Sequence, residues 1–366
     1  AASEDAGAKV HQTPTPVQGE LDLLERDGQA EEVKRLHLCE GFLPPAGLQF
    51  PQLTHLGLYH ANEAPLTQLL SQGHMPSLHH LRLHCDMTAA LWDALPSSLS
   101  SLRVVGCWAL GSQVKPNLRL VESYRAPVAS LSLLAPNLER LCCSIHDLQT
   151  WNSLSNLHHL RRLRVSLDVE LYEGPVPLSL DVLPASLSFL SLSVIFEDFV
   201  GSRRLANLRT CSLRLDSVPR LAALASNLEL LCLNDWPETP LPASLRRLCF
   251  HKMLYHCPHG KLEYLAALPS LQSLRLPCWL LEDLQGLAAI LKAAPPSLRR
   301  LEFTHNKKCR LDEHSYGSLL QCFADNLPAL RLTRFQQAQW DRVCDTLLRR
   351  CCFFFTSLSP GQLEEA

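Results

Sequence analysis

The chain has 366 residues, of which 46% are hydrophobic and 19% are charged, so it can bury a sizeable core. Its formal net charge of -2 argues against a globally basic nucleic-acid binder, and its 15 scattered cysteines lack the density of a short secreted disulfide scaffold. No stretch reaches the about 18 consecutive apolar residues that predict a membrane span. We therefore expect mostly reduced thiols and an intracellular protein of the cytoplasm or nucleus, with an organelle left open.

Residues 1–30 are rich in Pro, Gln, Gly, Ala and acidic side chains, which predicts a disordered or loosely attached segment. The stretch from Leu21 to Arg35 has the pattern of a short amphipathic cap. The first residues hold neither a starting Met nor an apolar signal core, so we expect a processed chain or a fragment of a longer one.

From residue 31 to 335 the pattern LxxLxL recurs, with apolar residues at its first, fourth and sixth positions. The array holds about 14 units at a mean spacing of about 23 residues, inside the 20–29 range of leucine-rich repeats. On a strand the fourth and sixth positions share one face, and one unit can bury that apolar row only against its neighbours. The fourth and sixth positions are Leu36/Leu38, Leu56/Leu58, Leu81/Leu83, Leu102/Val104, Val121/Ser123, Leu141/Cys143, Leu163/Val165, Leu190/Leu192, Cys211/Leu213, Leu231/Leu233, Leu248/Phe250, Leu274/Leu276, Leu301/Phe303 and Leu330/Leu332.

On these motifs the chain resembles the leucine-rich repeat superfamily. The resemblance implies an α/β solenoid with a curved, parallel concave β-sheet and an irregular to helical convex side. The long late repeats resemble the ribonuclease-inhibitor-like or F-box-associated arrays. The superfamily often carries Asn or Cys three residues after the sixth position, where only Cys107 and Asn306 stand here. We therefore expect no continuous Asn ladder at that position.

The late linking segments have helical periodicity. Leu280 to Lys292 predicts an amphipathic helix that Pro295 and Pro296 end, and residues 313–324 have a similar pattern. Residues 336–366 predict a C-terminal capping helix and tail, with the helix over Gln336 to Cys352. Phe353 to Phe355 would then pack as the end cap.

The outward positions of the repeats carry mostly basic side chains. In a strand that buries the fourth and sixth positions, the fifth and seventh point the other way, and the second and third lie nearby. Among these slots the only acidic residues are Glu122, Glu139, Glu229 and Glu302, whereas His37, His55, His79, His80, His84 and His251 extend the basic character. Lys34, Arg35, Arg119 and Arg331 also occupy such slots. The arginines that we expect to bind a partner are Arg82, Arg103, Arg140, Arg161, Arg162, Arg164, Arg209, Arg214, Arg246, Arg247, Arg275, Arg299 and Arg300.

This basic stripe has two main interpretations, and both stay open from the sequence. It is either a solvated sheet face or a surface for an acidic ligand, since Arg pairs well with carboxylate or phosphate. Nucleic acid is a weaker third interpretation, because nucleic-acid binders interleave aromatic side chains for base stacking. The stripe offers only Tyr59, Tyr124 and Phe189 for that purpose.

The remaining candidate chemistry is weak. His79, His80, His84 and Cys85 lie on one predicted strand, and His251, His256, Cys257 and His259 follow another, but neither group has paired C-x-x-C spacing, so we predict no metal and no cofactor. The sequence lacks G-x-S-x-G, G-x-x-x-x-G-K and H-E-x-x-H motifs, so we predict no enzyme. The vicinal pairs Cys142-Cys143 and Cys351-Cys352 fit packing better than redox work. The six tryptophans favour packing in linking segments, with a partner hot spot as the alternative.

We therefore interpret the sequence as a non-enzymatic protein-interaction scaffold that binds a macromolecular partner, with an acidic surface or tail, on its basic concave face. The alternative is the substrate-recognition region of an F-box-type ubiquitin-ligase adaptor whose F-box lies outside this chain.

Overall fold

The structure, a computed structural model, describes residues 32–38, 49–59, 63–167, 178–193, 199–200, 205–214, 227–234, 240–250, 263–277, 280, 283–304 and 353–356. It divides into two compact units, Ala1–Leu160 and Arg161–Ala366. The predicted segment 1–30, the helices over 313–324 and 336–352 and the last repeat at Leu330 lie outside the described residues.

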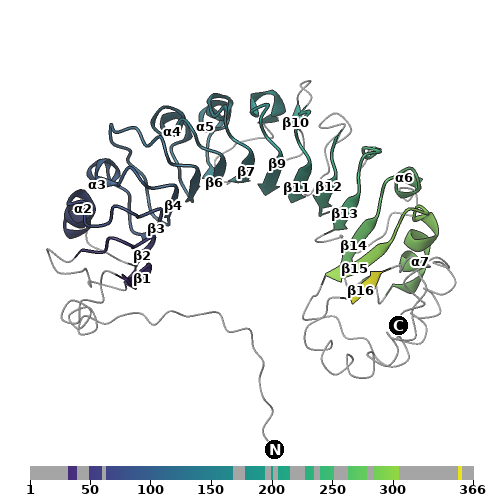
Figure 1. Ribbon diagram of the computed structural model, residues 1–366. Helices are drawn as coiled ribbons and strands as arrows, with labels where there is room; N and C mark the ends of the chain where they lie inside the picture. Colours follow the sequence, from purple (N-terminus) through teal and green to yellow (C-terminus); the bar gives the residue numbers. More distant parts are fainter. Residues whose placement is uncertain are drawn as a thin grey trace, which may run out of the picture. The chain divides into compact units, whose positions relative to one another are not determined.

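The first unit is a parallel sheet with strands in chain order (Figure 1). Each fourth-position residue pairs with the fourth position of the next repeat, as Leu36 does with Leu56 and Leu56 with Leu81. This register keeps each apolar row on one face and each polar row on the other. The strands are β1 (Arg35–Leu38), β2 (His55–Tyr59), β3 (His80–His84), β4 (Ser101–Val104), β5 (Leu120–Ser123) and β6 (Arg140–Ile145).

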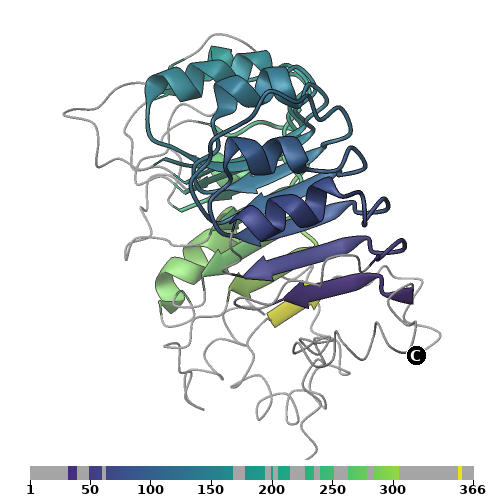
Figure 2. The same cartoon turned by 90° about the vertical axis from the view of Figure 1, so that its left-hand side faces the viewer.

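Short helices cover the outer side of this sheet, opposite the face that carries the polar rows (Figures 1 and 2). Trp92 and Trp151 are fully buried on that side, which confirms for these two tryptophans that they pack in the linking segments. Thr88 and Asp147 begin two of the helices, each accepting a bond from a backbone N–H of the first turn. The helices are α2 (Glu63–Ser71), α3 (Ala89–Ala94), α4 (Val128–Leu134), α5 (Leu148–Asn152) and the 3₁₀-helix η2 (Ser153–Asn156).

The second unit repeats the same plan with longer linkers. Its parallel strands are β7 (Arg162–Leu167), β9 (Phe189–Ser193), β11 (Thr210–Arg214), β12 (Leu230–Leu233), β13 (Arg247–Phe250), β14 (Ser273–Pro277) and β15 (Arg300–Thr304). Its helical segments are α6 (Glu263–Ala266), α7 (Leu284–Ala293) and the 3₁₀-helix η4 (Leu180–Val182), while β8 (Leu178–Ser179) and β10 (Phe199–Val200) form a separate small parallel pair. The helix predicted from Leu280 begins at Leu284, because Asp283 caps it by accepting from the N–H of Gly286.

Strand β16 (Phe353–Thr356) pairs antiparallel with β15 at the end of the second unit's sheet. The stretch that we predicted as an end cap therefore lies at the sheet edge and covers its unpaired backbone groups, which an exposed edge would leave open to another chain. The packing of its phenylalanine side chains stays a prediction.

The leucines of the repeats form the core. Every described fourth-position residue from Leu36 to Leu301 is buried, with an exposed fraction of 3% or less. Full burial of such a side chain contributes about 1.5–3 kcal/mol, so stacked rows stabilise strands that would be unstable alone. The weakest repeat buries Ser123 at its sixth position, where the hydroxyl accepts from the N–H of Arg125 and so remains hydrogen-bonded.

A polar ladder runs along the turns that precede seven of the described strands, at a position different from the usual Asn or Cys position of the superfamily. The residue just before the first leucine reaches back to a carbonyl of the preceding repeat, as Asn137 Nδ2 does to Pro116 O at 2.9 Å. Serine does the same in other repeats. The ladder consists of Ser98, Asn117, Asn137, Asn207, Asn227, Ser244 and Ser297. At the expected superfamily position, Asp86 accepts from the N–H of Cys107 at 2.7 Å.

The predicted fold class is confirmed. Both units have the parallel strands, the shared leucine core and the irregular to helical outer side of a leucine-rich repeat solenoid. Within the described residues, no helix is both long and apolar enough to cross a membrane.

Candidate protein-binding face

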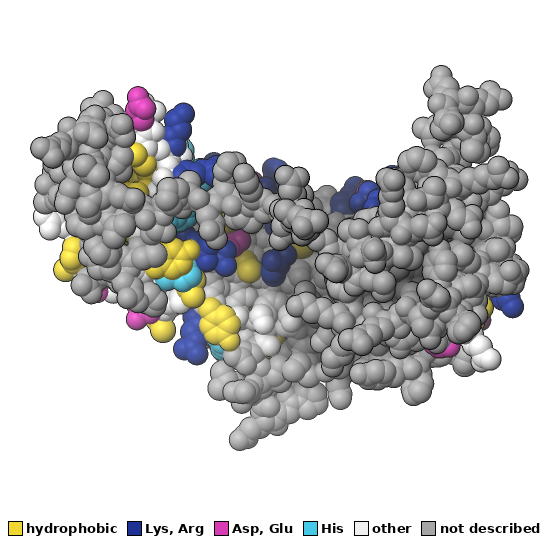
Figure 3. Space-filling view, turned by 90° about the horizontal axis from the view of Figure 1, so that it is seen from below, with side chains coloured by type: hydrophobic (Ala, Val, Ile, Leu, Met, Phe, Trp, Pro, Cys, Tyr) yellow, Lys and Arg dark blue, Asp and Glu magenta, His cyan; other side chains and the backbone are white. Residues whose placement is uncertain are grey.

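The open face, as we call it, is the side of each sheet away from the helices and consists of the side chains at the third, fifth and seventh repeat positions. Strand register aligns equal positions of consecutive repeats, so Arg82 lies beside Arg103 and Arg103 beside Glu122. Figure 3 looks onto this side and shows dark-blue Lys and Arg side chains gathered over the described strands.

Most of the predicted partner-binding arginines are exposed on the open face or at the turn that leads into it. Arg82 and Arg275 are half-buried, and of Arg214 the structure describes the backbone alone. The exposed members are Arg103, Arg140, Arg161, Arg162, Arg164, Arg209, Arg246, Arg247, Arg299 and Arg300. The structure thus brings the predicted residues onto one side of each unit. Their role in binding stays a prediction.

Each acidic residue among the outward positions forms an ion pair with an arginine of the stripe. Arg103 and Glu122 approach to 3.4 Å, Arg119 and Glu139 to 3.8 Å, and Arg209 and Glu229 to 3.9 Å. This pairing was not predicted from the sequence, although the partners occupy equal positions of consecutive repeats. All six side chains are 38–51% exposed, so each pair stabilises the fold by less than about 1 kcal/mol.

Glu302 is the exception, because it is buried between two arginines. Its side chain is 8% exposed and pairs with both Arg275 and Arg300, and the Nε of Arg275 donates to Glu302 Oε2 at 2.7 Å. Burial alone would lower the pKa of Arg275, but the hydrogen bond and charge of Glu302 outweigh it and raise that pKa. These two arginines therefore already have an acidic partner within the protein.

Several arginines of the second unit remain without such a partner. Arg162, Arg164 and Arg247 lie on strands β7 and β13, and Arg161, Arg246 and Arg299 directly precede strands. None of them forms an ion pair with an acidic residue in the part of the chain that the structure describes. The open face of the second unit and the turns that lead into it offer these charged groups to an incoming ligand.

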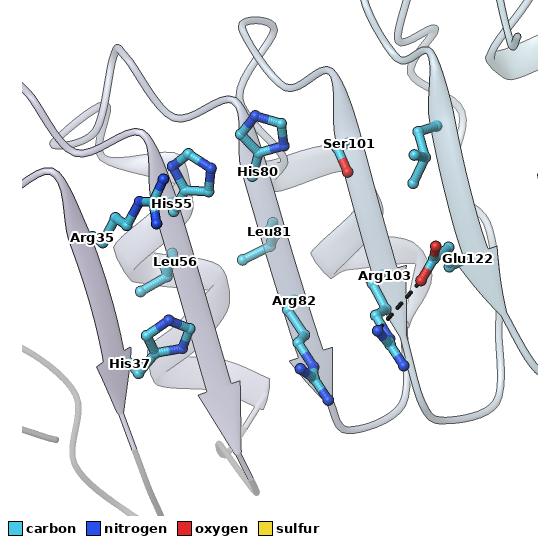
Figure 4. Close-up of a pocket in the computed structure, with 11 residues that line it drawn as sticks. Arg35, His37, His55, Leu56, His80, Leu81, Arg82, Ser101, Arg103 and Glu122 are labelled. Carbon is cyan, nitrogen blue, oxygen red and sulfur yellow. Dashed lines mark ion pairs between the residues drawn. The ribbon is translucent and has the colours of Figure 1, made fainter. Parts of the chain in front are cut away.

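In the first unit the open face carries a shallow hollow of about 290 Å³ over β1 to β5 (Figure 4). The polar residues of its wall come from two rows of the sheet, one at the third repeat position and one at the fifth. The third-position row holds Arg35, His55, His80 and Ser101, and the fifth-position row holds His37, Arg82, Arg103 and Glu122. The hollow is therefore lined mainly by basic or protonatable groups.

The aromatic rings at this end of the face are stacked on one another. The rings of His55 and His80 lie 4.2 Å apart between centroids, and those of Tyr59 and His84 lie 4.3 Å apart. The Nε of Arg82 donates to His84 Nε2 at 2.9 Å, and its guanidinium lies 5.6 Å from the centre of the Tyr59 ring. Stacking and cation–π contact hold these side chains in place across neighbouring strands.

Burial and neighbouring positive charges lower the pKa values of two of these histidines. The pKa of His55 is lowered first by burial and then by the charge of His80, with smaller contributions from Arg35, His37 and His79. The pKa of His80 is lowered by burial, by His79 and by Arg35. Both imidazoles therefore take up a proton only at a pH below their ordinary value of 6.5.

Two thiols meet on the open face of the second unit. Cys232 of β12 and Cys249 of β13 are register partners at the fifth repeat position, and a side-chain hydrogen bond joins them. Both are half-buried, whereas Cys143 and Cys211 are buried core residues. Cys142 lies on the open face and Cys143 in the core, so packing accounts for one member of that vicinal pair.

The predicted metal-like groups have different outcomes. His80 and His84 lie on β3, where their rings stack with those of His55 and Tyr59, respectively. The second group, His251 to His259, lies outside the described residues. Among the residues that are described, no three His, Cys, Asp or Glu side chains lie close enough together to hold a metal ion.

No model of a protein family matches the sequence, and no curated protein matches it. Solved structures of several proteins are similar to it, among them the following three. The circular leucine-rich repeat protein CroV588 has 17% identity and a TM-score of 0.41, with 77% of this chain covered. The chain spans 45% of the length of CroV588, which is less than half.

The other two structures are bacterial. The leucine-rich repeat-containing protein LegL7 from Legionella pneumophila has 11% identity and a TM-score of 0.38, with 73% of this chain and 96% of LegL7 covered. The internalin InlF from Listeria monocytogenes has 16% identity and a TM-score of 0.42, with 85% of this chain and 89% of InlF covered. The repeat spacing, the in-register parallel strands and the shared leucine core give both units the leucine-rich repeat fold.

Proposed function

We propose that the chain is a non-enzymatic protein-interaction scaffold whose open face binds a partner protein with an acidic surface or tail. The observation that carries this proposal is the surplus of exposed arginines after each acidic residue of the outward positions has its ion pair. Guanidinium groups bind carboxylates through paired hydrogen bonds, and a concentrated positive field speeds the arrival of an acidic partner.

The aromatic side chains favour a protein partner over a nucleic acid. A base-stacking platform needs ring faces that are open to solvent. Tyr59 is stacked on His84, and Tyr124, the most exposed aromatic of the face, lies 5.9 Å from the ring of His146. The face therefore offers charge without a row of open rings.

Binding of a short fluorescein-labelled oligoglutamate, followed by fluorescence anisotropy, tests the proposal. Arg247→Gln removes one exposed charge from β13, and Lys292→Gln removes the same charge from the exposed last turn of α7, outside the open face. We expect Arg247→Gln to weaken binding about 1.5- to 5-fold, the value of one exposed ion pair, and the double variant R246Q/R247Q to weaken it further.

Lys292→Gln is the matched control, because it lowers the net charge of the protein by the same amount. We expect it to leave the affinity nearly unchanged. An equal loss of affinity in Arg247→Gln and Lys292→Gln would show that only net charge matters, and would reject the open face as the binding surface.

The ubiquitin-ligase alternative places an acidic substrate on this same face. It differs from the scaffold in requiring an F-box in the full-length protein, and no feature of the described residues favours it over the scaffold.

A further inference from the structure

The hollow on the first unit's open face differs from the rest of the stripe because protonatable rings line it. The third-position row brings Arg35, His55 and His80 side by side on β1, β2 and β3, about 4.8 Å apart from strand to strand. His37 and Arg82 stand in the neighbouring fifth-position row, where the guanidinium of Arg82 points away from His80 (Figure 4).

Gly57 shapes the fifth-position row of the hollow. It stands between His37 and Arg82 in the register, and a Cβ built on it would lie 2.3 Å from Nδ1 of His37. The ring of His37 therefore occupies the space that a side chain at residue 57 would need. Any larger residue there would displace His37.

The charges that face His55 and His80 are almost all positive. Arg35 and His37 of β1 and His79, which directly precedes β3, are the charged neighbours that act on them. Arg82 of β3 and Arg103 of β4 also line the hollow. Glu122 of β5 is the acidic residue that lines the hollow, and its carboxylate is engaged by Arg103 at 3.4 Å. Thr54 lies within 2.8 Å of His55 Nδ1 through its hydroxyl, which adds a polar but uncharged neighbour.

We propose that this hollow is a proton-linked subsite that takes carboxylate groups of the acidic partner. The inference rests on the proposed function and adds to it the place and the pH dependence of binding. A carboxylate beside Arg35 offsets the positive charges that, after burial, lower the pKa values of His55 and His80. Its arrival therefore promotes proton uptake by the two imidazoles, and by linkage a lower pH strengthens its binding.

The pH dependence of binding distinguishes a carboxylate ligand from a phosphate group. Carboxylates remain ionised from pH 7.5 to pH 5.5, whereas a phosphate ester loses part of its second charge near pH 6. Protonation of the histidines would then be offset by the phosphate's loss of charge. Only the carboxylate gives a clear rise in affinity over this range.

The test compares oligoglutamate binding at pH 7.5 and pH 5.5 in the wild type, in H55Q/H80Q and in H158Q/H159Q. His158 and His159 are both exposed, belong to the same unit and lie outside the hollow, so their double variant is the matched control. We expect the wild type and the control to bind several-fold more tightly at pH 5.5, and H55Q/H80Q to show little change. In the NMR spectrum, oligoglutamate should raise the pKa values of the His55 and His80 rings.

A pH response in H55Q/H80Q equal to that of the wild type would overturn the subsite. Inorganic phosphate that raises the histidine pKa values where oligoglutamate does not would overturn the carboxylate assignment. If the wild type binds no oligoglutamate at either pH value, the proposed function itself is contradicted. The failure of the subsite and the failure of the proposed function are therefore distinguishable.

A second inference concerns the thiol pair of the second unit. Cys232 and Cys249 are direct register partners on parallel strands, which places their Cα atoms about 4.8 Å apart, inside the range of disulfide-bonded cysteines. Arg275 is the register partner of Cys249 on the other side, and Arg247 lies two residues before it. These two cations disfavour a bound metal cation and favour a thiolate.

The two thiols have different protonation behaviour. The hydrogen bond from Cys232 lowers the pKa of Cys249, and the charges of Arg275 and Arg247 lower it further against the effect of burial. The same hydrogen bond raises the pKa of Cys232, which therefore keeps its proton. Cys249 is the nucleophile of the pair, and Cys232 is the resolving thiol.

We infer that Cys232 and Cys249 form a reversible disulfide on exposure to hydrogen peroxide. The Cys249 thiolate attacks one peroxide oxygen, an S–O bond forms, the O–O bond breaks, and the hydroxide that leaves takes a proton to become water. Cys232 then gives up its proton, its sulfur attacks the sulfenic sulfur, and the second oxygen leaves as water. Two thiols lose two electrons, and one peroxide becomes two waters.

Peptide mapping by mass spectrometry after peroxide treatment and alkylation tests the inference in the whole chain. We expect a Cys232–Cys249 linked peptide that dithiothreitol reverses, and in Cys232→Ser a sulfenic acid at Cys249 that dimedone traps. Cys142 is the control thiol, because its register partner on β5 is Glu122 and not a cysteine. Full alkylation of both cysteines after peroxide, or oxidation of Cys142 at the same rate as Cys249, would overturn the proposal.

Discussion

At the scale of single residues, Glu302 has the most deeply buried carboxylate among the ion pairs of the described residues. Its nearly buried carboxylate is held by Arg275 and Arg300, both of which remain partly exposed to solvent. Removal of one member of a buried ion pair leaves the remaining charges without compensation. The partial exposure of the arginines reduces that penalty here.

We predict that Glu302→Gln lowers the free energy of unfolding by about 1–3 kcal/mol, the cost of leaving charged hydrogen-bonding groups unpaired. Glu229→Gln is the matched control, because Glu229 is 49% exposed and its pair with Arg209 is 3.9 Å long. Urea denaturation should show a change below about 0.5 kcal/mol for the control. Equal losses in the two variants would contradict the buried position of Glu302.

The stacked histidines should also make the fold sensitive to acid. Because the folded-state pKa values of His55 and His80 lie below 6.5, the unfolded chain binds more protons than the folded chain once the pH falls below that value. We predict that the urea midpoint decreases as the pH falls from 7.5 through 6.5 to 5.5. The decrease should be smaller in H55Q/H80Q and unchanged in H158Q/H159Q, and a midpoint that rises on acidification would refute the assigned direction of the pKa shifts.

At the scale of elements, the polar ladder before the strands explains why Asn and Ser recur just ahead of the first leucine. Asn137 Nδ2 donates to Pro116 O, two residues before the first leucine of the preceding repeat, and the hydroxyls of Ser98 and Ser244 donate to the carbonyl of that first leucine itself. The turn backbone is thereby hydrogen-bonded from one repeat to the next. Two side-chain types can serve the same position.

We predict that Asn137→Ala lowers the free energy of unfolding by about 1 kcal/mol through the lost hydrogen bond. Asn137→Ser should recover most of that loss, since serine already fills this position in other repeats. Thermal or urea unfolding measures both variants. A serine variant no more stable than the alanine variant would show that the ladder bond at this turn contributes little.

The strands were predictable from the sequence because one rule fixes them. The buried fourth and sixth positions recur at every unit, and the observed pairing of Leu36 with Leu56 or Leu274 with Leu301 follows directly from that alignment. The same alignment contained the ion pair of Arg103 with Glu122 and the thiol pair of Cys232 with Cys249, since partners share a repeat position. Taken one repeat at a time, the outward positions predict only which residue types lie on the face. The two pairs become visible when the same position is compared between consecutive repeats.

Other features of the site depend on three-dimensional detail that no spacing rule contains. The placement of His37 over Gly57 depends on a side-chain rotamer, and the lowered pKa of His55 depends on its burial and on the sum of several neighbouring charges. The polar ladder uses a turn geometry that differs from the superfamily's usual Asn position. The sequence therefore predicted which repeat positions align on neighbouring strands, and the structure was needed for the side-chain contacts between them.

At the scale of the whole molecule, a chain with a net charge of -2 carries basic open faces on its sheets. This separation of charge means that acidic residues lie mainly elsewhere, and that the long-range attraction of a partner depends on the face and not on the net charge. Such attraction is screened by salt, over a Debye length of about 10 Å at 0.1 M ionic strength.

The dependence of oligoglutamate affinity on salt concentration, compared between the wild type and R246Q/R247Q, tests the central claim most directly. The claim predicts that wild-type affinity falls steeply as the salt concentration rises from 0.05 to about 0.3 M, because exposed ion pairs are screened. It predicts a shallower slope for R246Q/R247Q and a wild-type slope for Lys292→Gln. Identical slopes for wild type and R246Q/R247Q, or an affinity independent of salt, would contradict a basic open face that binds an acidic partner.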